Sequence, residues 1–431
     1  MIIDFTISNY RSIREPQTIS FEATNDRHLE SYYVVNKGKY RILKMATILG
    51  ANASGKSNLI RAFNLLPKLM LSPCQDKSSE IRYEKFALSA EAKEDNSEII
   101  VNFICADKKY HYEVVFNNNL VHSEKLQCHP FDKLRSHLVY ERYTDVSTLV
   151  STIKWGANYS VGTIVRDLNV NLLHNRTVFG AFQMSNVDIP VLKEIVDWLS
   201  GYMLPIVSTS DQQLFNFTSS MLVENIKDKQ MVVSFLKKAD VGIRDFYIEE
   251  TIEEIPDSLL DIILNDSSIP EKAKEKIKSN PVSHTIKVNM LHSTSHGDVS
   301  MEYSEESNGT KRYYELSGVL MKIIKGSHFV AIDELECKLH PDLYKHFIIS
   351  FLDNAKESQM VFTTHLREFL SDDDFFRRDS IWITEKNVDG ETELYSLADF
   401  TEKEVSQLNV LEAYKAGRFG GIPHLGDTYI D

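Results

Sequence analysis

Hydrophobic and polar residues alternate near the start of the chain, and this pattern predicts β-strands within residues 1–50. The uninterrupted apolar run 45–49 predicts a buried strand that ends at Gly50. Apolar residues then recur at helical spacing from 56 to 71, and Pro73 stops this helix. The expected order is strand, glycine loop and helix, which is the usual entry to a phosphate-binding site.

The rest of the chain changes period twice. Residues 86–143 alternate with period two and predict an antiparallel meander with polar turns. From about 160 to 280 the period becomes helical without a sustained heptad, which predicts a compact helical insertion with helices at 219–238, 256–264 and 270–279. After 283, strands and helices alternate, which predicts a largely parallel sheet. The strands are expected at 283–293, 299–304, 328–333, 359–364, 381–385 and 394–397, and the helices at 309–325, 341–354 and 402–416.

Composition narrows the class of protein. A chain of 431 residues with 42% hydrophobic and 26% charged residues is globular, which excludes disorder, collagen and a coiled-coil rod. The cysteines lie far apart without zinc-ligand spacing, so a reducing, cytoplasmic location is expected. No apolar run has the length of a membrane span and no signal peptide is recognisable, so we expect a protein that is neither secreted nor embedded in a membrane. The net charge of −14 argues against a broad electrostatic grip on DNA, although a local basic groove stays open.

The strongest chemical signal is a complete G-x-x-x-x-G-K-S motif between the predicted strand and helix. Its glycines allow backbone N–H groups to face phosphate oxygens, while Lys56 is expected to reach the β and γ phosphates and the Ser57 hydroxyl to ligate Mg²⁺. An ordinary tight glycine turn would not require a lysine and a serine in this order. The expected nucleotide-binding residues of this segment are Gly50, Asn52, Ala53, Ser54, Gly55, Lys56, Ser57 and Asn58.

A second motif supplies the acidic groups that such a site needs. The apolar strand 329–332 ends in Asp333 and Glu334. Asp333 is expected to hold Mg²⁺ and Glu334 to polarise the attacking water. Because any strand can end in an acid, Asp333 and Glu334 indicate a nucleotide site only in combination with the P-loop.

Two weaker signals flank the acidic strand. Before it, Ser307, Asn308 and Gly309 open a predicted helix, and after it His365 ends an apolar strand. Taken singly, Ser307 could be an ordinary helix N-cap and His365 a core histidine. Their order along the chain is that of ABC-type ATPases.

These motifs make the chain resemble the ABC-like ATPases of the RloA and abortive-infection kind, relatives of SMC, RecF and OLD-type ATPases. The opening residues 5–13, the Leu339-His340-Pro341 loop and the tail 394–423 also match, so the resemblance covers both ends and leaves the middle largely unmatched. It implies an α/β fold, namely an ABC-type P-loop ATPase head with an antiparallel β meander and a helical insertion. The expected domains are 1–155 and 283–431 as the two halves of the head, and 156–282 as the insertion or lid.

The resemblance further implies a Mg²⁺-dependent ATPase. Two subunits would sandwich two ATP molecules, each bound by one P-loop and by the partner's loop 307–309. Glu334, His365 and Lys56 would be catalytic, and Arg11 would lie near the base. Because no nuclease or other effector is recognisable in the chain, a separately encoded nuclease or toxin in anti-phage defence is implied by analogy. Assemblies larger than the homodimer stay open.

Two alternatives remain at this point. A DNA-binding repair or maintenance ATPase of the RecF and SMC kind would carry the same motifs, with 133–135 and 272–278 as candidate basic stretches. A scaffold that binds ATP without hydrolysing it would also carry them. A ring motor of the AAA+ type is not expected, because its acids lie much closer to the P-loop than Asp333 lies to Ser57.

Overall fold

The computed structural model describes residues 1–89, 95–133, 135–159, 164–209, 212–223, 225–265, 271–372, 374–400, 409–423 and 426–427. The chain divides into two compact units, which we describe separately. The head unit comprises Met1–Thr209, Ile323–Cys337 and Ile349–Asp431, and the ribbon unit comprises Ser210–Lys322 and Lys338–Ile348.

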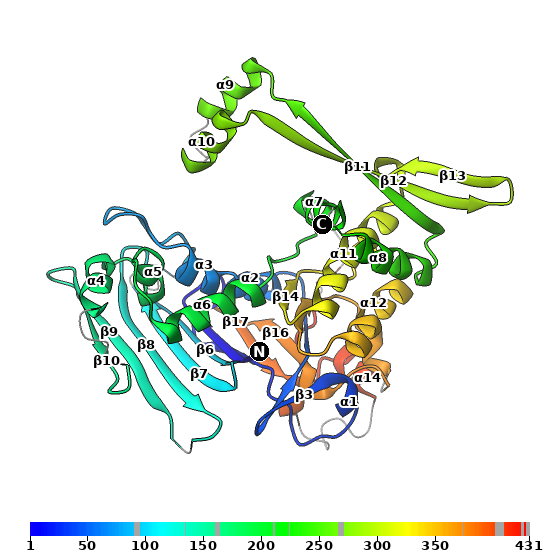
Figure 1. The fold of residues 1–431 in the computed structure, drawn as a ribbon. Helices are drawn as coiled ribbons and strands as arrows, with labels where there is room; N and C mark the ends of the chain where they lie inside the picture. Colours follow the sequence, from blue (N-terminus) through cyan, green and yellow to red (C-terminus); the bar gives the residue numbers. More distant parts are fainter. Residues whose placement is uncertain are drawn as a thin grey trace. The chain divides into compact units, whose positions relative to one another are not determined.

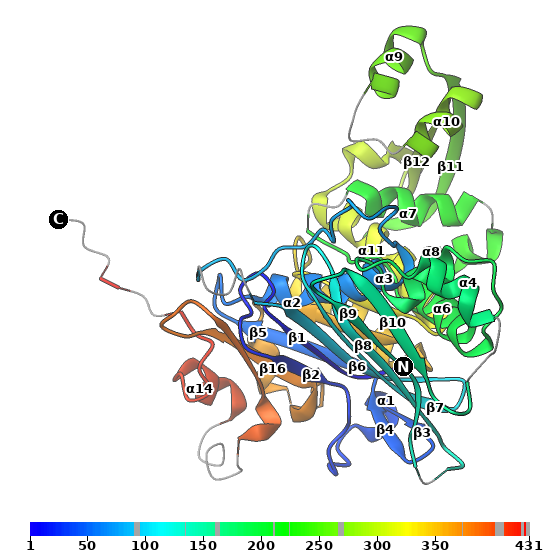
Figure 2. The same ribbon diagram turned by 90° about the vertical axis from the view of Figure 1, so that its left-hand side faces the viewer.

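A seven-stranded antiparallel sheet forms one part of the head unit, with strand order β10-β9-β8-β7-β6-β1-β2 (Figures 1 and 2). Alternate residues of its strands are buried, as in β7, where Tyr110, Tyr112 and Val114 are fully buried. The predicted meander is therefore confirmed. The strands are β1 (Ile2–Ser8), β2 (Gln17–Ser20), β6 (Ser97–Cys105), β7 (Lys108–Phe116), β8 (Val121–Pro130), β9 (His137–Asp145) and β10 (Val150–Trp155).

A five-stranded sheet carries the P-loop, with strand order β14-β15-β5-β16-β17. The first four strands are parallel and β17 runs antiparallel to β16, so the predicted, largely parallel sheet is confirmed for 328–333, 359–364 and 381–385. The predicted strands 283–293 and 299–304 are not part of this sheet, because these segments pair antiparallel in a separate three-stranded sheet. The central strand β5 is buried throughout, which explains its uninterrupted apolar run. The bounds are β5 (Met45–Gly50), β14 (Phe329–Ile332), β15 (Gln359–Thr363), β16 (Ile381–Lys386) and β17 (Thr392–Ser396).

Helices of the head unit pack on these sheets. Helix α2 contacts β5, β14 and β15, and α6 contacts β6 (Figure 1). Helix α6 begins at Pro190 and buries Leu192, Ile195 and Leu199 at helical spacing. The helices are α1 (Glu30–Tyr33), α2 (Lys56–Phe63), α3 (Leu65–Leu71), α4 (Ile164–Asn171), α5 (Val178–Gln183), α6 (Pro190–Tyr202) and α14 (Val410–Lys415), and a hairpin of β3 (Val34–Lys37) and β4 (Tyr40–Leu43) follows α1. The first part of the helix predicted at 402–416 lies outside the described residues.

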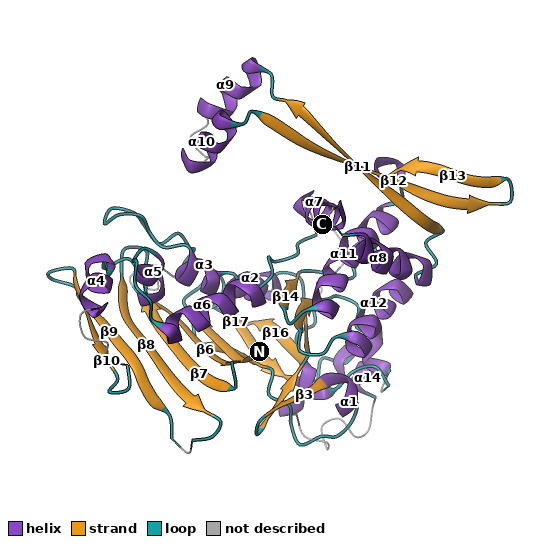
Figure 3. Ribbon diagram, in the orientation of Figure 1, coloured by secondary structure: helices purple, strands orange, loops and turns teal. Residues whose placement is uncertain are grey.

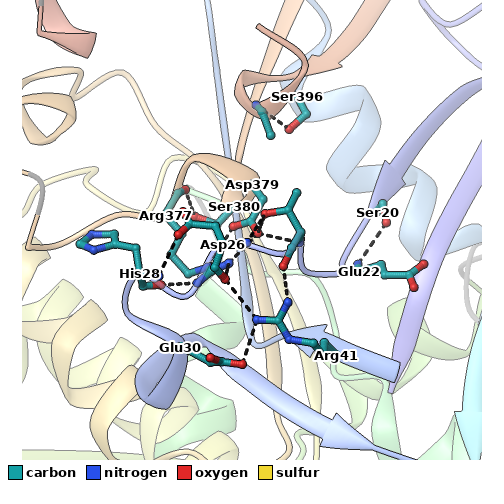
Figure 4. A network of polar contacts seen from close by, with 12 residues as sticks. Ser20, Glu22, Asp26, His28, Glu30, Arg41, Arg377, Asp379, Ser380 and Ser396 are labelled. Carbon is teal, nitrogen blue, oxygen red and sulfur yellow. Dashed lines mark hydrogen bonds and ion pairs between the residues drawn. The ribbon is translucent and has the colours of Figure 1, made fainter. Parts of the chain in front are cut away.

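A buried polar network fixes the loop before α1 to the start of β16 (Figure 4). Arg377 donates to both carboxylate oxygens of Asp379, at 3.0 and 2.7 Å, and to the backbone oxygens of Asp26 and His28. Thr24 donates its N–H and its hydroxyl to Asp379 Oδ2 at 2.9 and 2.8 Å. The Arg377 and Asp379 side chains are 0% and 4% exposed. The charges are thus paired and hydrogen-bonded, which is the condition for keeping them inside the protein.

The ribbon unit is built on a long antiparallel pair, β11 (Ile243–Glu254) and β12 (Val282–Thr294), extended by β13 (Gly297–Glu302) (Figure 3). Helices α9 (Asp257–Asn265) and α10 (Glu271–Ser279) join the far ends of β11 and β12. The unit also contains α7 (Gln212–Val223), α8 (Ile226–Lys238), most of α11 (Asn308–Lys325) and the first part of α12 (Pro341–Asn354).

The segment 156–282 was expected to be helical, but it includes the strand β11. Only the first part of β11 buries apolar side chains. Ile243 and Phe246 are buried there, whereas Tyr247 and Ile252 are 50% and 61% exposed. A strand whose outer half buries no apolar face lacks the period-two signal on which a prediction depends. Pairing with β12 over the whole length supplies the backbone hydrogen bonds instead.

In the described part of the chain, no helix combines the length and hydrophobicity needed to cross a bilayer.

Candidate functional site

The P-loop lies at the end of β5, between the ends of β15 and β16. Gly50, Ala53 and Gly55 have φ values of 152°, 63° and 109°, a range that favours glycine. A Cβ atom at Gly50 would overlap Thr384, and one at Gly55 would overlap Thr392. The two glycines of the motif are therefore required both by the backbone angles and by the neighbouring strands.

Hydroxyl groups hold the outside of the P-loop in place. The Ser54 hydroxyl pairs with Thr384 Oγ1 at 2.7 Å, and Thr392 Oγ1 donates to the Ser54 carbonyl at 2.9 Å. Ser12 Oγ lies 2.8 Å from Thr392 Oγ1 and accepts a 2.8 Å hydrogen bond from Asn58. The loop is thus positioned by residues from the first and last parts of the chain.

Lys56 opens helix α2 and is bonded to its own loop. Its Nζ donates to the carbonyl oxygens of Gly50 and Ala51, each at 2.8 Å. Burial lowers the pKa of Lys56, and the charges of Asp333, Glu334 and Glu336 oppose this shift. The cation is therefore kept close to the backbone that would surround a phosphate.

The acidic strand brings Asp333 to the P-loop. The Ser57 hydroxyl donates to Asp333 Oδ1 at 3.1 Å, and the Thr363 hydroxyl donates to the same oxygen at 2.7 Å. The Asp333 N–H donates to the Val207 carbonyl at 2.8 Å, because the segment after α6 pairs with β14. The predicted metal-binding pair Ser57 and Asp333 is thus brought together by three separate chain segments.

Glu334 and His365 lie beside this pair. Glu334 has a φ of 48°, and its N–H donates to Thr363 Oγ1 at 2.7 Å. His365 Nε2 is 3.8 Å from Glu334 Oε1, and the two side chains are 40% and 42% exposed. Both groups can therefore be reached from solvent.

Two cavities lie next to the P-loop. One of about 720 Å³ is lined by residues 49–54, His365 and Arg367, and by Gly421–Pro423 of the tail. The other, of about 710 Å³, is lined by Arg11, Ser12, Asn58, Lys386 and the apolar residues Phe86 to Leu88. Both volumes are in the range of sites for small ligands.

The residues present fit a nucleotide with Mg²⁺. A serine hydroxyl next to one aspartate is the protein part of a site in which Mg²⁺ takes its other ligands from phosphates and water. Among the described residues, no group of three or more His, Cys, Asp or Glu side chains could hold a metal alone. A metal here would accordingly depend on the phosphates.

Arg11 lies at the rim of the second cavity. It has a φ of 54°, and its Nη2 donates to Glu84 Oε1 at 2.7 Å. Its guanidinium lies 5.7 Å from the centre of the Tyr10 ring. Arg11 is therefore held in place on the same cavity as Ser12 and as Asn58 in the first turn of α2.

Ser307, Asn308 and Gly309 lie in the ribbon unit, at the N-terminus of α11. The Ser307 hydroxyl accepts from the Thr310 N–H at 3.1 Å, which is an ordinary N-cap contact. Ser307 and Asn308 are exposed, and a Cβ atom at Gly309 would lie 3.0 Å from the Lys338 carbonyl. Glu306 before them pairs with His292 at 2.6 Å. The loop is an exposed start of a long helix, which is a suitable surface for an anion.

Several residues at the site escaped the sequence analysis as individuals. Thr363 contacts both acids, Thr384 and Thr392 hold the P-loop, and Glu336 accepts a hydrogen bond from the His365 N–H. Thr363 and Glu336 are close in sequence to His365 and Glu334, so a search around those residues could have found them. Thr384 lies in the segment 381–387, which also matches the family that the sequence resembles, but neither Thr384 nor Thr392 stands out from its strand pattern.

One known family model matches part of the chain. Residues 222–371 match the family model described as "AAA domain, putative AbiEii toxin, Type IV TA system". No curated protein matches the chain.

Similar solved structures are SMC heads. An SMC head bound to the C-winged helix domain of ScpA has 15% identity and a TM-score of 0.41, covering 92% of this chain and 97% of that one. The SMC head domain from Thermotoga maritima has 11% identity and a TM-score of 0.40, covering 92% and 98%. An SMC head with an extended coiled coil, bound to the C-terminal domain of ScpA from Pyrococcus furiosus, has 14% identity and a TM-score of 0.37, covering 96% and 99%.

The matched segment contains the acidic strand β14 and ends beyond His365, so it includes the acidic half of the site. The P-loop on β5 faces this half in the same sheet. Over residues 222–371 the chain is therefore similar to this AAA domain family, and a P-loop motif lies in the same sheet as the matched acidic strand.

Proposed function

We propose that this protein is a Mg²⁺-dependent ATPase that works as a dimerisation switch for a separate effector protein. The observation that carries the proposal is the cluster of Ser57, Asp333 and Thr363, with Glu334 and His365 beside it. A structural turn has no use for a metal-binding pair next to an exposed carboxylate and imidazole. In an ABC-type ATPase, which the sequence resembles, these groups would bind Mg²⁺, activate water and contact the γ phosphate.

Each residue of the site would have a separate role in ATP binding or hydrolysis. Backbone N–H groups of the P-loop and the Lys56 ammonium would bind the β and γ phosphates, and Lys56 would exchange its two carbonyl partners for phosphate oxygens. Ser57 and Asp333 would hold Mg²⁺, which when bound neutralises developing charge on the phosphates. Glu334 would orient and deprotonate the attacking water, and His365 would donate a hydrogen bond to the γ phosphate.

The base would occupy the cavity lined by Arg11, Asn58 and Phe86 to Leu88. Its apolar wall suits one face of a purine, and the side chains of Arg11 and Asn58 offer donors at the edge. Arg11 is fixed there by Glu84 and Tyr10, so it would not need to be ordered on binding.

Dimerisation would complete the site. The exposed N-terminus of α11 in one subunit, with Ser307, Asn308 and Gly309, would cover the γ phosphate bound by the other subunit. ATP would then join two subunits and hydrolysis would release them. Assemblies of several such dimers are compatible with this scheme.

The cellular role rests on analogy. The family description names a toxin and a type IV toxin–antitoxin system, and the sequence resembles abortive-infection ATPases. We therefore propose that the switch controls a nuclease or toxin encoded by a separate gene in anti-phage defence, in the cytoplasm.

ATP binding and trans completion can be tested with two variants. Lys56→Ala should lower ATP affinity at least about 100-fold, because the charge that cradles the phosphates is lost. Ser307→Arg should leave binding by an isolated subunit unchanged, but should abolish ATP-dependent dimers and steady-state hydrolysis. Calorimetry, light scattering and phosphate release would measure the three quantities. Unchanged hydrolysis in Ser307→Arg would rule out the shared site.

A duplex-DNA clamp is the second candidate, and one observation favours it. A cavity of about 540 Å³ in the head unit is lined by Arg61, Lys68 and Arg82 together with Tyr10 and Tyr83, and also by the acidic residues Glu80 and Glu84. A clamp should bind duplex DNA with affinity that falls steeply between 50 and 200 mM salt. Purification of Glu334→Gln from host lysate with Mg-ATP would separate the candidates: a stoichiometric effector protein supports the switch, whereas bound DNA alone supports the clamp.

A further inference from the structure

Glu336 lies in the turn after β14 and is tied to the end of β15. Its Oε1 accepts a 2.6 Å hydrogen bond from the His365 N–H. The same two chain segments are joined by Leu335 N–H to the Thr363 carbonyl at 3.1 Å and by the Glu334 N–H to Thr363 Oγ1. The acidic strand and the histidine strand are therefore connected at consecutive positions beyond the end of their sheet pairing.

The other carboxylate oxygen of Glu336 is buried and has no hydrogen-bond partner in the described part of the protein. A buried acceptor without a donor is costly, and the cost is greater for an ionised group. The charge of Glu336 acts on the Lys56 ammonium, where it opposes the effect of burial. Glu336 thus has one oxygen on the histidine backbone, while its charge acts on the phosphate-binding lysine.

Several simpler roles explain these contacts less well. A surface carboxylate would keep both oxygens in water, and a structural anchor would satisfy both oxygens, as Asp379 does. The proposed metal-holding groups are Ser57 and Asp333, which contact each other, whereas Glu336 Oε1 accepts from the His365 N–H. The contacts of Glu336 are those of a group that sets the position of its neighbours.

We propose that Glu336 is a positioning residue of the ATPase site, which holds the His365 backbone so that the imidazole stays beside Glu334. This inference rests on the proposed ATPase function. It makes His365 dependent on Glu336: without the carboxylate, the segment after Thr363 is released and the imidazole no longer meets the γ phosphate in a fixed orientation.

The test compares Glu336→Ala, Glu336→Gln and His365→Ala in the full chain. Glu336→Gln keeps an oxygen that can accept from the His365 N–H, whereas Glu336→Ala removes it. We expect Glu336→Ala to lower kcat about 10- to 100-fold with little change in KM, and Glu336→Gln to restore kcat to within about 5-fold of the wild type. The double variant Glu336→Ala/His365→Ala should be no slower than the slower single variant, because the two residues act as one unit. Glu15→Ala, at a carboxylate whose side chain is 72% exposed, is the control.

Hydrogen exchange of the nucleotide-free protein gives a readout independent of hydrolysis. The peptide that carries the His365 amide should exchange faster in Glu336→Ala and at the wild-type rate in Glu336→Gln. Equal exchange in the wild type and Glu336→Ala, or additive losses of kcat, would overturn the role of Glu336 and leave the ATPase function intact. A wild type that neither binds a fluorescent ATP analogue nor hydrolyses ATP would overturn both.

Discussion

The head unit contains two clusters of charged residues that differ in burial and in how fully their polar atoms are hydrogen-bonded. Around Arg377 and Asp379, the charges are buried, and both oxygens of the carboxylate have donors (Figure 4). Around Glu334 and His365, the side chains are about two-fifths exposed, Glu334 has a positive φ, and the nearby Glu336 keeps a buried oxygen without a partner. A closed cluster contributes to the fold, whereas an open and strained one is available for a ligand.

The largest effect should come from the open cluster. Glu334→Gln removes the general base without changing the size of the side chain, so kcat should fall about 10²- to 10⁴-fold while ATP still binds. Phosphate release and binding of a fluorescent ATP analogue measure the two quantities. The exposed Glu15→Gln serves as control and should keep wild-type turnover. If turnover in Glu334→Gln stayed within about 2-fold of the wild type, another group would be the base.

The closed cluster should respond in stability alone. Arg377→Met leaves the Asp379 carboxylate buried without its cation, which should lower the free energy of unfolding by about 3–5 kcal/mol. Urea titration followed by circular dichroism measures this loss. Arg27→Met removes an arginine whose side chain is 81% exposed, so it should cost less than about 1 kcal/mol. Equal losses in the two variants would contradict the assignment of Arg377 to a closed structural cluster.

A pair of glycine variants tests strain at the open site. Gly55→Ala places a Cβ on a φ of 109° and against Thr392, so it should destabilise the protein by about 1–3 kcal/mol and weaken ATP binding. Gly201→Ala, in helix α6 with no atom within 4 Å of the added Cβ, should stabilise it by about 0.5–1 kcal/mol. Differential scanning calorimetry of both variants provides the comparison, and a stabilised Gly55→Ala would exclude strain at the P-loop.

The smallest effect concerns pH. Burial raises the pKa of Asp379, but hydrogen bonds and charge from Arg377, with those from Thr24, outweigh it, so the pKa lies below its ordinary value. A carboxyl with a lowered folded-state pKa stabilises the protein above its unfolded pKa of about 4, and this contribution is lost as the pH falls below that value. Urea unfolding between pH 3 and 7 should therefore show an acid-side loss of stability that is smaller in Asp379→Asn. If the free energy of unfolding depended on pH identically in the wild type and in Asp379→Asn, the pKa of Asp379 would not be lowered in the folded protein.

The open cluster around Glu334 and His365 could be predicted from the sequence more fully than the closed cluster around Arg377 and Asp379. The P-loop and the acidic strand are short motifs whose chemistry can be read directly, and both lie where strands meet loops, as expected. Arg377 and Asp379 are close in sequence, but their partners at residues 24–28 are more than 340 positions away. Such contacts depend on the order of strands in the sheet, and a local pattern cannot provide it.

The segment 156–282 shows the same limit of local sequence patterns. Helices α8, α9 and α10 could be predicted because their apolar residues recur at helical spacing, but β11 could not, since its outer half is exposed on both faces. Thr384 and Thr392 likewise hold the P-loop through contacts that only the folded chain creates.

The strand order of the P-loop sheet also has a consequence for protein synthesis. Strand β5 pairs on one side with β15 and on the other with β16, and both are made about 300 residues later. At about 5–20 residues per second, a ribosome takes about 15–60 s to supply them. Throughout that interval the nascent chain presents an apolar strand with two unpaired edges, so its yield in the cell should depend on chaperones and on the speed of translation.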